Sequence, residues 1–184
     1  APVSLRRRIE EMIRRETNHA RAGKPAAIKA KMNALVDPAI IGLLYEASQA
    51  GVQIDLVVRG MCSLRPGVAG VSDSIRVISV IGRFLEHSRL FWFANDGAAE
   101  LYLGSADWME RNLDRRVEAV VPVQDPELCM HLEWLLQLYL DDNSAAWTMG
   151  SDGAYKRADA TGGREARRSQ DELMELWGLN ATQA

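Results

Sequence analysis

Apolar residues recur at helical spacing in several parts of the chain. The spacing of Leu5, Ile9 and Ile13 predicts a first helix, which a Gly-Lys-Pro stop signal ends. Asp37 and Asp125 each precede a proline, and Asp before Pro favours a helix start. Together these signals predict helices over roughly residues 4–22, 38–50, 126–140 and 165–177.

Other stretches alternate apolar and polar residues or are rich in β-branched side chains. Both patterns are typical of strands. They predict strands at residues 26–33, 52–58, 75–81, 90–93, 101–103 and 117–123. The strand–helix–strand order at the start predicts a parallel pair joined by a right-handed crossover. The fold class is therefore α/β: a mixed sheet of five or six strands flanked by helices, followed by a partly irregular C-terminal tail.

The pattern divides the chain into three parts. Residues 1–24 are interpreted as a linker helix from a preceding domain, 25–142 as the catalytic α/β domain, and 143–184 as a C-terminal tail with a short helix. The chain does not start with methionine, and its first residues already belong to a basic helix. We therefore expect it to be a piece of a longer protein.

Composition limits the setting of the protein. Its 47% apolar and 26% charged residues are normal for a globular domain, and no apolar run approaches the roughly 20 residues of a membrane span. Cys62 and Cys129 lie far apart without metal-ligand spacing. A reduced, cytoplasmic setting follows, with membrane association of a complete enzyme left open.

Candidate chemistry gathers around His87, one of three histidines in the chain. Arg83 and Arg89 flank it, just before an apolar strand. Imidazole can act as a nucleophile or as an acid and base near neutral pH, and guanidinium groups grip phosphoryl oxygens. This combination indicates phosphate chemistry.

Two further positions extend this pattern. Arg59 follows a predicted strand directly, and the carboxyl ends of strands line the ligand crevice of open α/β sheets. Ser105 follows Gly104 at the end of another strand. The order His-x-Arg, then Gly-Ser-x-Asp, resembles half of a phospholipase-D-like site, whose pattern is His-x-Lys, then Gly-Ser-x-Asn. Here Arg89 replaces the lysine and Asp107 the asparagine.

Longer motifs resemble the C-terminal domain of the long, multidomain polyphosphate kinase family. They cover most of the chain from residue 26 to about residue 157. The matching segments are Lys31-Met-Asn-Ala-Leu-Val-Asp37, Val58-Arg-Gly-Met-Cys-Ser-Leu-Arg-Pro-Gly67, residues 74–89 with Glu86-His-Ser-Arg89, Tyr102-Leu-Gly-Ser-Ala-Asp-Trp-Met-Glu-Arg-Asn112, Arg115-Arg-Val-Glu118 and Asp152-Gly-Ala-Tyr155.

The resemblance implies reversible transfer of the ATP γ-phosphoryl group to polyphosphate through a phosphohistidine in the preceding domain. His87 then corresponds to the second active-site histidine and Arg59 to an ATP-contacting arginine. Mg²⁺ is expected in the full enzyme, with its ligands outside this chain. The remaining domains of the parent enzyme are necessary partners, so the chain alone is expected to be inactive.

Other residues add to the expected site. Arg89, Arg65 and Arg116 are candidates for ATP or phosphate binding, and Ser105 for a turn or a phosphate hydrogen bond. We expect Glu86 or a backbone carbonyl to fix the His87 tautomer. For six arginines, a phosphate contact and an ordinary ion pair are about equally favoured: Arg65, Arg76, Arg83, Arg111, Arg115 and Arg116.

Two other functions stay open at this stage. A phospholipase-D-type phosphodiesterase would need two copies of His87 in a dimer, and Arg89 and Asp107 count against it. A non-catalytic polyphosphate-binding module is the other. The net charge of −3 and the lack of a broad basic surface exclude nucleic acid as a partner. The expected ligands are ATP, ADP and polyphosphate; the oligomeric state and the favoured reaction direction are left open.

Overall fold

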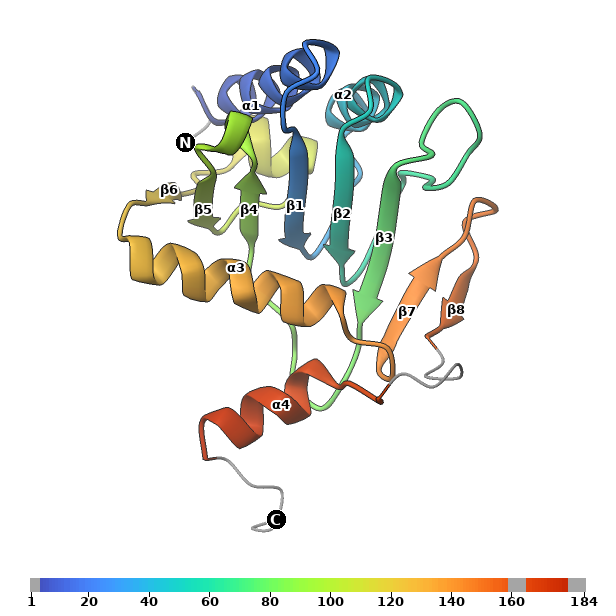
Figure 1. The fold of residues 1–184 in the computed structure, drawn as a ribbon, viewed down its shortest axis with the longest axis vertical. Helices are drawn as coiled ribbons and strands as arrows, with labels where there is room; N and C mark the ends of the chain where they lie inside the picture. The colour runs from blue at the N-terminus through green and yellow to red at the C-terminus, as the bar shows by residue number, and fades with distance from the viewer. Residues whose placement is uncertain (1–3, 159–164, 179–184) are drawn as a thin grey trace.

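A computed structural model describes residues 4–158 and 165–178. Helices cover both faces of one sheet (Figure 1). The helices are α1 (Leu5–Arg21), α2 (Pro38–Gln49), α3 (Pro126–Leu140), α4 (Ser169–Leu176) and the short turns η1 (Asn95–Gly97) and η2 (Arg111–Arg115). The strands are β1 (Ala27–Met32), β2 (Gln53–Val58), β3 (Ile75–Val80), β4 (Leu90–Phe93), β5 (Glu100–Gly104), β6 (Val120–Val123), β7 (Ala146–Met149) and β8 (Tyr155–Arg157).

The described residues form an eight-stranded mixed sheet in the order β6-β5-β4-β1-β2-β3-β7-β8. β1, β2 and β3 run parallel, and β4, β5, β6, β7 and β8 join as antiparallel neighbours. The predicted parallel pair and the mixed sheet flanked by helices are confirmed. The expected strand number was too low, because β7 and β8 fall in the stretch interpreted as irregular.

Two helix starts follow the predicted chemistry. The Asp37 side chain accepts hydrogen bonds from the backbone N–H groups of Ala39 and Ile40 and so caps α2. Asp125 accepts from Leu128 and caps α3 in the same way. Between β5 and β6, Trp108 forms a β-bridge with Leu35, and the π-type turn η2 follows it.

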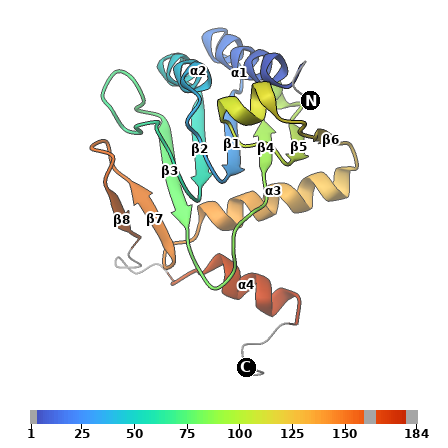
Figure 2. The same cartoon turned by 180° about the vertical axis from the view of Figure 1, so that it is seen from behind.

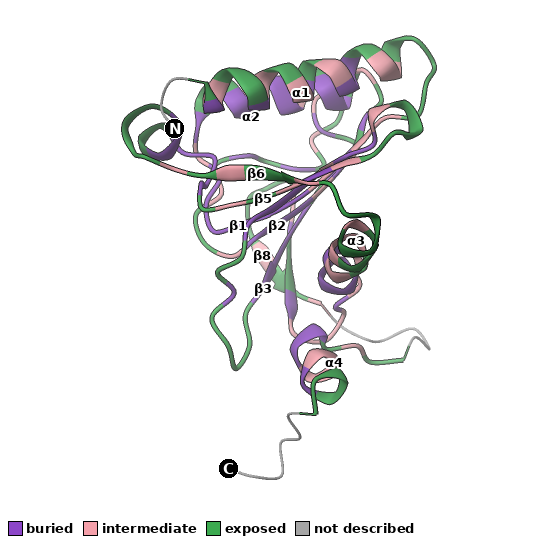
Figure 3. Ribbon diagram, turned by 90° about the vertical axis from the view of Figure 1, so that its left-hand side faces the viewer, coloured by how far each residue is buried: buried purple, intermediate pink, exposed green. Residues whose placement is uncertain are grey.

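The core has two sides because strand side chains alternate between the faces of a sheet. Leu56 and Val58 of β2 pack with α1 and α2, whereas Val57 packs with α3. The buried sides of α1 and α2 accordingly face the sheet (Figure 3). Seen from behind, the yellow segment that carries η2 lies beside α1 (Figure 2).

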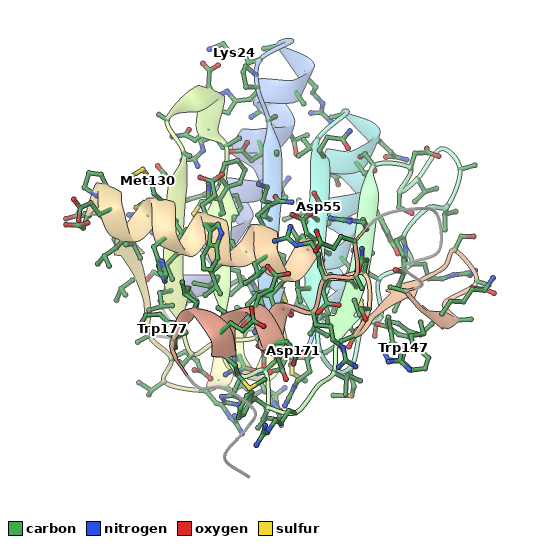
Figure 4. All side chains as sticks on the ribbon, turned by 60° about the horizontal axis from the view of Figure 1, so that its bottom comes forward. Lys24, Asp55, Met130, Trp147, Asp171 and Trp177 are labelled. Atoms are coloured by element: carbon green, nitrogen blue, oxygen red, sulfur yellow. The ribbon has the colours of Figure 1, made fainter. Side chains whose placement is uncertain are left out.

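The outer side of α3 and the end of α4 expose large apolar residues. Met130 is 64% exposed and Trp177 is 65% exposed. In Figure 4, Met130 near the start of α3 and Trp177 at the end of α4 both lie on the left-hand side of the view. Within the described ranges, the helices lack the length and continuous apolar surface that a bilayer span needs.

The three-part division of the chain stays a prediction.

Candidate active site

The candidate site lies where β1 and β2 end, β4 begins and β5 ends. The carboxyl ends of β1 and β2 point downward in Figure 1, and β4 runs the opposite way beside β1. Arg59 therefore comes from the end of β2, His87 from the approach to β4, and Ser105 from the end of β5. All three line one pocket of about 540 Å³. The structure thus brings the three residues together, and their roles in binding or catalysis stay a prediction.

Three arginines of this pocket are unpaired. The guanidinium groups of Arg59, Arg111 and Arg116 line it, and none forms an ion pair or hydrogen bond with any residue that the structure describes. Like charges at close range repel one another, so such a cluster costs free energy in the absence of an anion. The arrangement suits a ligand with several negative charges.

Arg89 is paired, unlike these three. Its Nε and Nη2 donate to the two carboxylate oxygens of Asp107 at 3.2 and 3.1 Å, and both side chains are buried. These are the two residues that depart from the phospholipase-D-like pattern. Each departure therefore complements the other, because a guanidinium and a carboxylate form a planar two-bond pair.

The third guanidinium nitrogen of Arg89 faces His87. Nη1 lies 3.0 Å from Nδ1 and 3.3 Å from Nε2 of the ring, and it donates to the His87 carbonyl at 2.8 Å. Because a guanidinium only donates, a ring nitrogen that bonds to it must be an acceptor. Asp107 thus holds Arg89, and Arg89 in turn orients the imidazole.

Glu86 does not orient His87, contrary to one of the two expectations. Its carboxylate turns to the other side of the loop and lies 3.0 Å from Nζ of the buried Lys31. Lys31 also donates to Ser88 at 2.8 Å and lies over the Tyr139 ring. Burial lowers the pKa of Lys31, and the Glu86 carboxylate opposes this shift.

Helix α4 holds the loop that carries His87. The Gln170 side chain accepts a hydrogen bond from the Phe84 N–H at 2.9 Å and donates to the Phe84 carbonyl at 2.9 Å. It also lies 2.6 Å from the Glu86 carboxylate. One amide thus satisfies both backbone groups of Phe84, as a neighbouring strand would. The back of the loop is fixed while its front faces the pocket.

Ser105 is engaged as a turn residue. Its hydroxyl hydrogen-bonds to Glu118 and accepts from the backbone N–H of Ala119 at 3.2 Å. Asn112 donates to the other oxygen of Glu118 at 2.5 Å. Glu118 therefore joins the end of β5 to η2 at the wall of the pocket.

Arg65 is not among the residues that line this pocket. Its guanidinium donates to the carbonyl of Ser151 from Nε at 2.9 Å and fixes a loop against the β7–β8 turn. Arg76 and Arg115 form ordinary ion pairs, with Asp55 at 2.8 Å and Glu110 at 2.6 Å. The structure does not bring Arg65 together with His87, because sequence spacing does not give the direction of a loop side chain, and its phosphate-binding role stays a prediction.

Sequence reasoning missed some site residues. Asn33, Asn112 and Glu118 also line the pocket. Each lies within one of the family motifs, but their residue types and spacing did not point to a role in the site. No cluster of three or more His, Cys, Asp or Glu side chains that could hold a metal ion occurs within residues 4–158 and 165–178.

The pocket lies at the edge of a mixed α/β sheet and places a histidine among arginines, an arrangement that suits an anion. Residues 1–170 match the model of the family "Polyphosphate kinase C-terminal domain 2". The chain therefore belongs to the polyphosphate kinase family, as the motifs predicted.

Known proteins agree with this assignment. The chain is 57% identical to a polyphosphate kinase of Parasynechococcus marenigrum over all of its length and 26% of that protein. It is 54% identical to one of Pseudomonas aeruginosa over 95% of the chain and 25% of that protein. The crystal structure of polyphosphate kinase from Porphyromonas gingivalis matches with a TM-score of 0.89 and 37% identity, over 94% of this chain and 26% of that one. The chain thus spans about a quarter of the length of these relatives.

Proposed function

We propose that this chain supplies one half of the active site of a polyphosphate kinase, which reversibly transfers the ATP γ-phosphoryl group to polyphosphate. The observation that carries the proposal is the set of unpaired guanidinium groups of Arg59, Arg111 and Arg116 around His87. A chain of phosphoryl groups, or the terminal phosphates of ATP, offers the matching density of negative charge.

The proposed division of labour follows from the contacts of each residue. Phosphoryl transfer spreads negative charge over the equatorial oxygens, so catalysis consists mainly of positioning and preorganised positive charge. Arg59 and Arg116 would contact phosphoryl oxygens directly. Arg89 would act as a positioning residue, because Asp107 already occupies two of its nitrogens.

His87 would lie beside the reacting phosphates as the second active-site histidine. There it would donate a proton to the leaving oxygen or stabilise the transferring group. The phosphohistidine itself would be formed in a domain that precedes this one. Mg²⁺ is expected in the complete enzyme, with ligands outside these residues.

The test uses a complete enzyme: the Parasynechococcus polyphosphate kinase with this chain in place of its matching segment. His87→Ala should abolish measurable polyphosphate synthesis, a loss of at least about 10²–10⁴-fold for a residue in acid–base catalysis. His19→Ala on α1 is the matched control and should keep full activity. Wild-type synthesis by His87→Ala would refute the role given to His87.

A phospholipase-D-type phosphodiesterase is the alternative that the His-x-Arg order leaves open. The buried Arg89–Asp107 pair does not favour it, because it replaces the lysine and asparagine of that pattern. Hydrolysis of a chromogenic phosphodiester by the chain alone would revive this function. We expect no hydrolysis, and no turnover of ATP by the chain alone.

A further inference from the structure

Asn33 has a buried side chain whose polar atoms find no partner. The residue is only 7% exposed, and it follows β1 directly. Neither its Nδ2 nor its Oδ1 forms a hydrogen bond with any residue in the described part of the chain. Leaving a buried amide unpaired costs free energy, so a native structure that keeps one calls for an explanation.

The backbone of Asn33 is held firmly in place. Its N–H donates to Asp107 at 2.7 Å, and its carbonyl accepts from the N–H of Gly60 at 2.8 Å. A Cβ atom on Gly60 would lie only 2.9 Å from that carbonyl oxygen, so a glycine is needed for the two loops to approach. Asn33 is thus fixed between the pair that orients His87 and the loop that carries Arg59.

The unpaired amide belongs to the wall of the arginine pocket. Asn33 lines this pocket together with Arg59, His87 and Arg116. Asn112 lines it too and also has an unpaired atom, but that atom is its Oδ1, since its Nδ2 donates to Glu118. An acceptor does not suit a phosphoryl oxygen. Asn33 therefore differs from Asn112 in having free N–H donors.

We propose that the Asn33 side-chain amide binds a phosphoryl oxygen of the ligand in this pocket. The inference rests on the proposed function and adds a neutral, directional donor to the cations around His87. Guanidinium groups attract the anion from many directions, whereas an amide fixed at both backbone groups selects one position of the phosphoryl group. The ligand chemistry is that of ATP phosphates and polyphosphate alike.

Two variants of the complete enzyme test the proposal. Asn33→Leu keeps a similar side-chain size and removes both polar atoms. Asn33→Asp keeps the shape, removes the donors and adds a charge that repels phosphate. We expect the KM for the phosphorylated ligand to rise about ten- to a hundredfold, as for a lost hydrogen bond to a charged group. The melting temperature should stay the same or rise, because the lost amide had no partner.

Asn18→Asp, on the exposed side of α1, is the control with the same chemistry and charge change. The KM for ATP is measured in synthesis and the KM for polyphosphate in the reverse reaction. Comparing the two values shows which of these ligands contacts Asn33. A rise in either value, with an unchanged melting temperature, supports the proposal and identifies the ligand.

Two outcomes would overturn the inference. One is wild-type KM values with a lower melting temperature for Asn33→Leu, which would give the amide a structural role. The other is an Asn33→Asp variant that behaves like Asn18→Asp, and this comparison holds even if Asn33→Leu fails to fold. In either case, synthesis by the wild type and its loss in His87→Ala would leave the proposed function intact. A wild-type enzyme without synthesis would refute that function instead.

Discussion

Arg6 and Arg15 of α1 differ from the pocket arginines in what faces their guanidinium groups. Arg6 binds two carboxylates at once, with 2.6 Å contacts to both Asp37 and Asp114. Arg15 lies 3.0 Å from Glu100. In the pocket, Arg59, Arg111 and Arg116 have no carboxylate partner among the described residues.

This difference separates arginines that pair with carboxylates inside the fold from arginines whose charge is not paired. Arg6 joins α1 to the start of α2 and to η2, so its charge is used inside the fold. The pocket arginines keep their charge available and repel one another until an anion arrives. Clustered arginines in a sequence are therefore only a hint, because the fold decides which of them are neutralised by a carboxylate and which are not.

Among the arginines, the largest effect is expected for Arg59. In the complete enzyme, Arg59→Gln should lower kcat/KM about 10²–10³-fold, as for the loss of one charge-stabilising donor at the transition state. Its melting temperature should not change, because Arg59 has no ion pair to lose. Arg15→Gln is the matched control, and its kcat/KM should equal that of the wild type. Equal kinetic losses in both variants would remove the distinction between the two groups of arginines.

An intermediate effect is expected in the pH dependence of stability. Burial alone would raise the pKa of Asp37, but hydrogen bonds from Arg6, Ile40 and Ala39 outweigh it and lower the pKa. A carboxyl whose folded pKa is lowered stabilises the fold above its unfolded pKa of about 3.9 and loses that contribution as the pH falls through the folded value.

Asp37→Asn should therefore lower the free energy of unfolding by about 1 kcal/mol at neutral pH, while it keeps an acceptor for the helix cap. The difference from wild type should shrink below about pH 4. Urea denaturation at several pH values measures it, with Glu127→Gln on exposed α3 surface as the control. A difference that is constant from pH 7 to pH 2 would mean that the Arg6 pairing contributes nothing.

The smallest expected effect is in salt dependence. Contacts with a polyanion release counterions, so the apparent affinity for polyphosphate should fall with salt concentration. Arg116→Gln should reduce the slope of the log–log plot by about one, whereas Arg15→Gln should leave it unchanged. Titrations of the complete enzyme at several salt concentrations measure this slope. An unchanged slope for Arg116→Gln would place that residue outside the contact surface.

Much of the fold could be predicted because its signals are local. Asp37-Pro38 and Asp125-Pro126 begin α2 and α3, and the parallel pair β1–β2 follows from the strand–helix–strand order. β7 and β8 could not be predicted in the same way. They are four and three residues long, and their strand character depends on pairing with β3 and with each other.

The site was partly predictable for a related reason. Arg59 and His87 could be placed because they adjoin strands, whose ends converge at one edge. Arg65 lies in a long loop whose path is set by distant contacts such as that with Ser151. The unpaired state of Asn33 is a property of packing, which no local pattern encodes.

The hydrogen bonds between Gln170 and Phe84 also affect the order in which the chain folds during synthesis. Gln170 lies 86 positions after Phe84 in the sequence. A ribosome therefore releases β4, β5 and the arginines of the pocket long before it adds the residue that fixes the loop between β3 and β4. The loop takes its final shape only when α4 has been synthesised, so this side of the pocket is fixed after the strands that surround it.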